Sequence, residues 1–363
     1  MKDVLAEICE KVIQLEKSGQ RIIKLHTVDP DLPVDKKIIT SAIQSLKNGE
    51  THYSSSAGLL ELRKSLARKY NTSSDNVVIG NGSRSLLYGL VQSILDNGDE
   101  VIIPEPEWAH FLVPFIKQKS VTVFRVPRDE TKSWDIDINY LKNKITSRTK
   151  LILVSDPNNP TGTFLSSQRL QKLQKISRKR HIYLIYDSAY STLELAKQKK
   201  ILDLKNPFFI LLGTFSKGFA MPGFRVGYLI SENKHLIDQI INFNYVTIQC
   251  LPEFTQKAAI TALKNEENIL QKARNIYSKR LDSALKILAK NHIRFVRPKA
   301  APFIYLYVGK NKAEELAYIL IKNNISVCPS TAFSNCDDYI RVSLTVGTKA
   351  ITKALTLICK NLK

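Results

Sequence analysis

Residues 150–187 read KLILVSDPNNPTGTFLSSQRLQKLQKISRKRHIYLIYD, which is an apolar run, a loop, a basic stretch and a second apolar run. The two apolar runs, Lys150–Ser155 and Ile182–Asp187, are short and rich in aliphatic and aromatic residues, as buried strands are. The basic stretch Ser167–Arg180 between them predicts a helix. A strand, a helix and a second strand in this order predict two parallel strands joined by a crossover helix.

The same alternation extends over most of the chain. Five further runs predict strands: Asn76–Gly80, Glu100–Pro104, Val121–Pro127, Phe208–Thr214 and Arg225–Ile230. Seven strands that are mostly separated by helices predict an α/β fold, with a three-layer α/β/α large domain around a mostly parallel seven-stranded sheet. A short Gly/Pro loop separates the last two strands, so these two are expected to pair antiparallel.

A second, smaller domain is predicted at the C-terminal end. A long helical pattern over residues 266–290 leads into an α+β segment. Its predicted elements are strands His292–Pro298, Ile304–Val308 and Tyr339–Leu344 and a helix at Ala313–Asn323. We therefore expect a large domain over residues 32–275 and a small domain built from residues 1–31 and 276–363, joined by the long helix.

The charge of the chain raises the question of a nucleic-acid partner. Its 54 Lys and Arg outnumber 33 Asp and Glu, which gives a net charge of +21. The lysines are dispersed, however, and no helix-turn-helix, RNP or zinc-finger pattern is present. We therefore predict no nucleic-acid partner, whereas an anionic substrate or cofactor gains from positive steering.

Composition also restricts the location of the protein. With 44% hydrophobic and 24% charged residues, the chain has an ordinary globular composition. No apolar run approaches the ~20 residues that span a bilayer, and the N-terminus lacks the pattern of a secretory signal. Five scattered cysteines fit free thiols, and neither they nor the histidines show metal-ligand spacing. We predict a cytoplasmic protein with no membrane partner and no metal.

Reactive side chains follow the predicted strands at their C-terminal ends, where open α/β sheets bind ligands. Lys217 lies just beyond the apolar strand that ends at Thr214. Desolvation at such a place lowers the pKa of a lysine and makes its amine a nucleophile, although an isolated lysine more often reaches solvent. With Arg225 eight residues later and hydroxyls beside it, Lys217 suits a Schiff-base site next to a phosphate.

Three other loops carry polar groups that fit the same ligand. Asp187 ends a strand, where its carboxylate suits a protonated pyridine nitrogen or caps the next helix, and Tyr190 follows three residues later. Asn159, in a loop with two prolines, either presents its amide to a ligand or belongs to a structural turn. Residues 80–84 supply glycines and free N–H groups at a helix N-terminus, which bind phosphate well.

Together these motifs resemble the fold-type I pyridoxal-phosphate enzymes, in particular the class I/II aminotransferases of the aspartate and histidinol-phosphate type. The matching stretches are Ile23–Pro30, Gly49–Tyr53 with Gly58–Arg63, Asn159–Gly162, Tyr186–Tyr190, Ser216–Tyr228 and Tyr339–Ser343. The resemblance implies an enzyme that moves an amino group between an amino acid and a 2-keto acid through a Lys217 Schiff base with pyridoxal 5′-phosphate. It also implies a homodimer with shared active sites.

The resemblance assigns a role to each candidate residue. Lys217 would bind the cofactor and move a proton, Asp187 would keep the pyridine nitrogen protonated, and Tyr190 would bind the phenolic oxygen together with Asn159. Trp108 would stack on the ring. The phosphate would meet Gly82, Ser83, Arg84, Thr214, Ser216 and Arg225, and Tyr53 from the other subunit. The substrate would meet Val28, Asn159 and Arg341, with the Arg341 guanidinium binding its α-carboxylate in a bidentate pair.

Departures from the family pattern leave the substrate open. Val28 stands where many relatives carry a glycine, which would narrow the pocket. Arg84 stands where a smaller or neutral residue is common, and it either adds a phosphate contact or faces a second anionic group of the substrate. Decarboxylases, lyases and amino-acid cyclases share this fold, so such a reaction remains an alternative, also on a phosphorylated substrate. A DNA-binding regulator is disfavoured, because the matching segment begins at Ile23 and leaves no room for an added domain.

Overall fold

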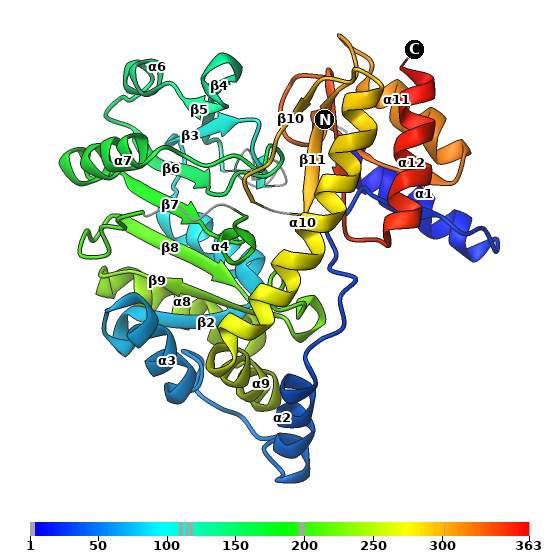
Figure 1. Cartoon of the computed structure of the whole chain (residues 1–363). Coiled ribbons are helices and arrows are strands. Elements are labelled where there is room, and N and C mark those ends of the chain that lie inside the picture. The colour runs from blue at the N-terminus through cyan, green and yellow to red at the C-terminus, as the bar shows by residue number, and fades with distance from the viewer. Residues whose placement is uncertain are drawn as a thin grey trace.

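The chain is described by a computed structural model that covers all residues except 1–3, 109–111, 114–115, 117–118, 196–199, 301 and 363. Figure 1 shows a large part built around one twisted sheet and a smaller part beside it, with the long helix α10 (Glu266–Lys290) running from one to the other. None of the helices in the described part of the chain has the length and apolar character that crossing a bilayer requires.

The central sheet has eight strands in the order β2-β9-β8-β7-β6-β3-β4-β5 (Figure 1). Their bounds are β2 (Val77–Asn81), β3 (Glu100–Glu105), β4 (Thr122–Asp129), β5 (Asp135–Ile136), β6 (Thr149–Ser155), β7 (Tyr183–Asp187), β8 (Phe209–Thr214) and β9 (Val226–Ile230). Neighbours pair in parallel from β8 to β4, whereas β9 is antiparallel to β8 and β2. The mostly parallel sheet and the antiparallel pairing of the last two predicted strands are confirmed.

The sheet has one strand more than the seven predicted. The additional strand β5 consists of only two residues and pairs antiparallel with the end of β4 after a short turn. Two residues are too few to produce a recognisable apolar run, so the sequence pattern gives no signal for this strand.

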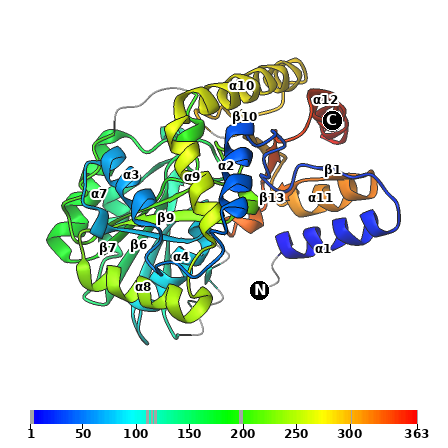
Figure 2. The ribbon, with the colours of Figure 1, turned by 90° about the horizontal axis from the view of Figure 1, so that it is seen from below.

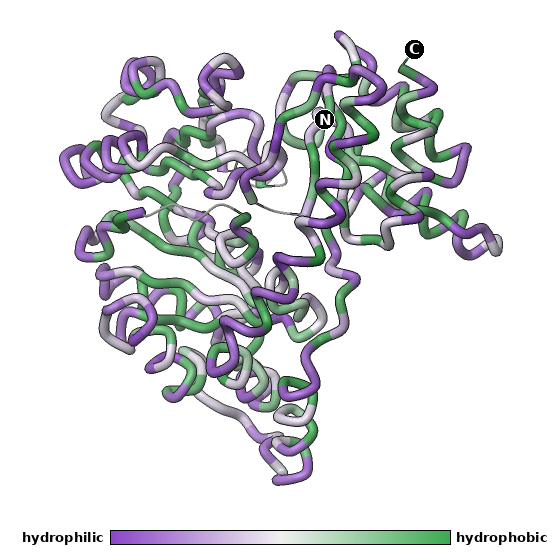
Figure 3. The backbone as a smooth tube through the Cα atoms, in the orientation of Figure 1, coloured by the Kyte–Doolittle hydropathy of each residue, from purple (hydrophilic) through white to green (hydrophobic). Residues whose placement is uncertain are grey.

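Helices cover both faces of the sheet, which confirms the three-layer prediction. On β2, Val77 and Ile79 belong to one hydrophobic cluster and Val78 to another, because successive side chains of a strand point to opposite faces. The first cluster packs under helices α2 (Lys36–Lys47), α3 (Leu60–Tyr70), α6 (Ile138–Asn143), α7 (Ser167–Arg180) and α9 (Glu253–Lys264). The second packs under α4 (Gly82–Ile94) and α8 (Lys234–Ile248). In Figure 3 the strands are largely green and α7 at the edge is largely purple.

The smaller part has its own sheet and core. Its four strands, in the order β10-β11-β14-β13, are all antiparallel. They are β10 (Phe295–Val296), β11 (Phe303–Tyr307), β14 (Tyr339–Ser343) and β13 (Cys328–Pro329), and they lie with helices α11 (Ala313–Lys322) and α12 (Thr348–Asn361). The two-residue strands β1 (Ile23–Lys24) and β12 (Ile325–Ser326) pair in parallel. An α+β arrangement was predicted for this segment.

The N-terminal segment packs with the C-terminal part. Figure 2 shows α1 (Val4–Lys17) beside α11, and the Tyr318 hydroxyl on α11 donates to the Glu7 carboxylate at 3.0 Å. Ile8 on α1 shares a hydrophobic cluster with the end of α10. The division into residues 32–275 and residues 1–31 with 276–363 stays a prediction, and the separate hydrophobic cores of the two parts support it.

Candidate active site

A cavity of about 820 Å³ lies where β6, β7 and β8 end, a position typical of ligand sites in open α/β sheets. Thirteen of the predicted site residues line it: Val28, Gly82, Ser83, Arg84, Trp108, Asn159, Asp187, Tyr190, Thr214, Ser216, Lys217, Arg225 and Arg341. The exception is Tyr53, whose side chain is 85% exposed on the surface of the single chain. The structure therefore brings together residues from both parts of the chain.

Lys217 follows β8 and points into the cavity. Its Nζ donates a hydrogen bond to the backbone oxygen of Val28 and lies 5.7 Å from the centroid of the Tyr190 ring. The pKa of Lys217 is lowered to about 8, mainly by removal from water and in part by the nearby Arg341 and Arg84 charges, while Asp29 and Asp187 act in the opposite direction. A large share of this amine is therefore neutral and nucleophilic at mildly basic pH.

Asp187 ends β7 and is 8% exposed. Its Oδ1 accepts a hydrogen bond from the Ala189 N–H at 2.9 Å. Burial raises the pKa of Asp187 to about 7; the Ala189 hydrogen bond and the Lys217 charge act against this rise, and the Glu107 charge adds to it. Because burial disfavours the charged form of this carboxyl group, a protonated ring nitrogen beside it would stabilise that form.

An anion-binding cradle lies at the start of α4. Gly82 has a φ of +74°, and the backbone of Gly82 and Ser83 lies directly against β9. A Cβ on Gly227 of β9 would lie 2.4 Å from the Ser83 nitrogen, so only glycine permits this approach. The Thr214 and Ser216 hydroxyls and the Arg225 guanidinium line the same end of the cavity, and these donors with a helix N-terminus suit a phosphate group.

Arg341, on β14, is 1% exposed and firmly oriented. Its Nη1 donates to Asn159 Oδ1 at 2.9 Å and its Nη2 donates to the His26 oxygen at 2.6 Å. Within the described residues its Nε has no hydrogen-bond partner, and a buried donor left in this state costs free energy. A carboxylate bound by the guanidinium would satisfy that donor.

The indole of Trp108 lies close to two cations. The guanidinium carbons of Arg84 and Arg341 each lie 5.7 Å from the centroid of the Trp108 ring. Basic side chains outnumber the two carboxyl groups of Asp29 and Asp187 in the cavity lining, and this excess suits a ligand with more than one anionic group.

The cavity as a whole fits pyridoxal 5′-phosphate. One end offers amides, hydroxyls and a guanidinium for the phosphate, and Asp187 offers a carboxyl group for the ring nitrogen. Between them lie the Lys217 amine, the Asn159 amide and the aromatic face of Trp108. Within the described residues, no group of three or more His, Cys, Asp or Glu side chains is arranged to hold a metal ion.

Several lining residues were not predicted from the sequence. Helix α1 contributes Leu5, Ala6 and Cys9 to the cavity wall, and Ser155 contributes at the end of β6. No motif marks the α1 residues, because their position depends on how α1 packs in the fold. Ser155 stands four residues before Asn159, so the strand-end rule that singled out Asn159 also applies to it.

Comparisons with known proteins identify the family of the chain. The family model for aminotransferase class I and II matches residues 20–358. The aspartate aminotransferase of Thermotoga maritima is 28% identical over 361 residues, which cover 97% of this chain and 94% of that protein. That of Thermococcus kodakarensis is 30% identical over 341 residues, which cover 94% and 88%.

Among solved structures, a single mutant of the Thermus thermophilus aspartate aminotransferase superposes with a TM-score of 0.92 at 25% identity, covering 99% of this chain and 97% of that one. The Thermotoga maritima aspartate aminotransferase superposes with a TM-score of 0.89 at 27% identity, covering 100% and 97%. With the family matched over nearly its whole length, the chain belongs to the class I and II aminotransferases and is a pyridoxal 5′-phosphate-dependent transaminase of fold type I.

Proposed function

We propose that this aminotransferase acts on a dicarboxylic amino acid such as aspartate, with Arg341 binding the α-carboxylate and Arg84 the side-chain carboxylate. The observation that carries the proposal is the pair of guanidiniums, each 5.7 Å from the Trp108 ring, in one cavity with Lys217. The names of the similar proteins, which are aspartate aminotransferases, support it. A decarboxylase, lyase or cyclase reaction has no such support.

The proposal includes the roles of the cavity residues. Pyridoxal phosphate, when bound, supplies an electron sink for the charge that develops at the substrate Cα. Lys217, with a pKa lowered to about 8, would take up and return the proton at that carbon. Asp187 would hold the proton on the ring nitrogen. Burial raises the pKa of Tyr190, so its phenol stays protonated and can donate a hydrogen bond to the cofactor oxygen, next to the Asn159 amide.

The remaining roles concern cofactor and substrate binding. The phosphate would be held by Gly82, Ser83, Thr214, Ser216 and Arg225. Val28 would line the substrate side of the cavity, where its buried side chain packs with Tyr190 and Phe303. Trp108 would cover the face of the cofactor ring.

We also propose a homodimer with shared active sites. Ile39, Ile43 and Leu46 on α2, together with Tyr53 and Leu60, are exposed apolar side chains on neighbouring segments. Figure 1 shows α2 projecting from the body of the large part, next to α9. Exposed apolar groups of this kind are typical of an interface, and Tyr53 would reach the phosphate of the other subunit. A cytoplasmic location remains part of the proposal, supported by the odd number and wide scatter of the five cysteines in the sequence.

The experiment is a single-turnover titration of the cofactor-loaded enzyme, followed by its visible absorption. We expect aspartate or glutamate to convert the cofactor to its amino form at lower concentration than asparagine or phenylalanine. Replacing Arg84 by Met should lower kcat/KM for aspartate about 10- to 100-fold, the loss expected for a charged hydrogen bond, with little change for phenylalanine.

Arg84→Lys serves as the matched control, because it keeps the positive charge but removes the two parallel N–H donors with which a guanidinium binds a carboxylate. An equal loss for aspartate and phenylalanine in Arg84→Met would place Arg84 on the cofactor instead of on the substrate side chain. Release of CO₂ or ammonia without conversion of the cofactor would favour the decarboxylase or lyase alternative.

A further inference from the structure

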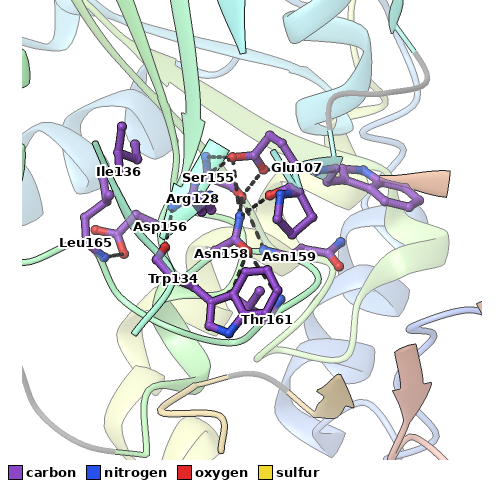
Figure 4. Close-up of polar contacts among 12 residues, drawn as sticks. Glu107, Arg128, Trp134, Ile136, Ser155, Asp156, Asn158, Asn159, Thr161 and Leu165 are labelled. Atoms are coloured by element: carbon purple, nitrogen blue, oxygen red, sulfur yellow. Dashed lines mark hydrogen bonds and ion pairs between the residues drawn. The ribbon is translucent and has the colours of Figure 1, made fainter. Parts of the chain in front are cut away.

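A buried ion pair lies directly behind the cavity wall and has no part in the roles proposed above. Glu107 and Arg128 have side chains that are each 1% exposed, and Arg128 Nη2 lies 2.9 Å from Glu107 Oε2. Figure 4 shows this pair between the end of β6 and the loop that carries Asn159. A buried ion pair adds little net stability by itself, so stability alone does not explain why this pair lies next to the active-site loop.

The Glu107 carboxylate is surrounded by donors. Its Oε2 also accepts hydrogen bonds from the Ser155 N–H at 3.0 Å and from Asn158 Nδ2 at 3.4 Å. Its Oε1 accepts from the Trp108 N–H at 3.0 Å and from the Ser155 hydroxyl. Burial raises the pKa of Glu107, whereas the Arg128 charge and the hydrogen bonds from Ser155 and Trp108 act against this rise and favour the carboxylate.

The Ser155 hydroxyl links this anion to the substrate-binding residues. Because its proton is directed to Glu107, its oxygen is free to accept, and it accepts from the Asn159 N–H at 3.3 Å. Asn159 in turn accepts from Arg341 Nη1 at 2.9 Å through its Oδ1. A continuous series of hydrogen bonds therefore runs from the buried ion pair to the guanidinium at the cavity.

A second connection leads to the same guanidinium. The Glu107 N–H donates to the Phe333 oxygen at 3.0 Å, and the Arg341 guanidinium carbon lies 5.0 Å from the Phe333 ring centroid. Glu107 is thus connected to Arg341 by a polar route through the large part and by packing in the small part.

We propose that Glu107 is a positioning residue for substrate binding, which fixes the Ser155 hydroxyl and through it holds Asn159 and Arg341 in the orientation that binds a carboxylate. The inference rests on the proposed function, because Arg341 is the carboxylate-binding group there. Neither Glu107 nor Ser155 touches the substrate carboxylate in this scheme, and their effect passes through the orientation of Arg341.

The test measures ligand binding as well as turnover. Succinate, which has two carboxylates and no amine, and 3-phenylpropionate, which has one, are titrated against the cofactor-loaded enzyme by visible absorption. Affinity for pyridoxal phosphate and the melting temperature are measured on the same variants. The variants are Glu107→Gln, which removes the charge, and Ser155→Ala, which removes only the linking hydroxyl and keeps the ion pair intact.

We expect Ser155→Ala to weaken the binding of both carboxylates about tenfold, with a change in pyridoxal phosphate affinity of less than about threefold. KM for the amino acid should rise more than kcat falls. Glu107→Gln should show the same pattern with a lower melting temperature, since Arg128 loses its partner.

The matched control is Lys200→Met. Lys200 forms an ion pair with the buried Asp156, which anchors the other side of the same loop through the Leu165 N–H. This variant should lose stability and keep its carboxylate affinities within about twofold. A Ser155→Ala protein that binds both ligands like the wild type would overturn the proposal, and so would equal losses in Ser155→Ala and Lys200→Met.

The two ligands separate this inference from the proposed function. If the wild type binds 3-phenylpropionate as tightly as succinate, the role of Arg84 fails, and the positioning role of Glu107 is still decided by the monocarboxylate. If neither ligand binds the wild type, Arg341 is not the carboxylate-binding group and both proposals fall.

Discussion

Burial shifts the pKa values of Lys217 and Asp187, the two most important ionisable groups of the site, in opposite directions. The same desolvation lowers the pKa of the Lys217 amine to about 8 and raises that of the Asp187 carboxyl to about 7, because in both cases the charged form is disfavoured. A neutral amine is a nucleophile, and a carboxyl near its pKa readily binds a cationic partner. Both groups are therefore prepared for a ligand that supplies an electrophile and a basic nitrogen.

The Asp187 pKa predicts how the stability of the cofactor-free protein depends on pH. The folded-state pKa of about 7 lies above the ordinary 3.8, so the folded protein holds this proton more tightly than the unfolded chain does. Protonation of Asp187 therefore adds roughly 4 kcal/mol to the free energy of unfolding. This contribution is fully present below pH 3.8 and is lost as the pH rises through about 7. Urea unfolding of cofactor-free wild type and Asp187→Asn should show this loss in the wild type alone. Parallel pH dependences in the two proteins would contradict the assignment.

At the scale of elements, the start of α4 and strand β9 form the anion cradle together. The helix N-terminus supplies the amides, and β9 must come close for those amides to face the cavity. Gly227 allows this contact because it has no side chain, as the 2.4 Å separation of a Cβ from the Ser83 nitrogen shows. The cradle is therefore a property of two elements in contact and of neither one alone.

Replacing Gly227 by Ala should push the start of α4 away from β9 and weaken pyridoxal phosphate binding at least about tenfold, since charge-assisted hydrogen bonds to the phosphate are lost. Gly223→Ala is the matched control, because nothing lies within 4 Å of a Cβ at that position. Fluorescence titration of the cofactor-free variants with pyridoxal phosphate measures both. If Gly227→Ala binds the cofactor like Gly223→Ala, the cradle lies elsewhere.

At the scale of the whole molecule, all the predicted site residues of one chain except Tyr53 line a single cavity. The cavity itself lies between the two parts of the chain, with Lys217 contributed by the large part and Arg341 by the small part. Movement of one part relative to the other would therefore change the distance between the amine and the carboxylate-binding group.

The dimer prediction belongs to this scale. We expect a native mass of about twice the 41.1 kDa of one chain, measured by light scattering. Tyr53→Phe should weaken pyridoxal phosphate binding several-fold through loss of one hydrogen bond to the phosphate, at an unchanged mass. Tyr140→Phe, at an exposed tyrosine on α6, is the control and should leave the affinity unaltered. A monomer with full cofactor affinity would exclude the shared site.

Local patterns were sufficient for much of the fold. Apolar runs such as Lys150–Ser155 and Phe208–Thr214 correspond to observed strands, since a strand buried on both faces needs continuous apolar sequence. The sequence pattern did not predict the two-residue strand β5, and it predicted β10 longer than it is, because two residues are too few to show a periodicity. Thirteen residues chosen from the motifs line one cavity, which the order of strands and loops already implied.

The sequence by itself determined the order of the strands along the chain, the helices that separate most of them and the reactive residues at the strand ends, because these depend on neighbours within a few positions. Only the tertiary structure decided which groups meet. Asn159 and Arg341 are 182 positions apart and Glu107 and Ser155 are 48 apart, yet each pair is hydrogen-bonded. The pKa values of Lys217 and Asp187 were decided in the same way, because desolvation depends on the side chains that the fold packs around a group and not on its neighbours in sequence.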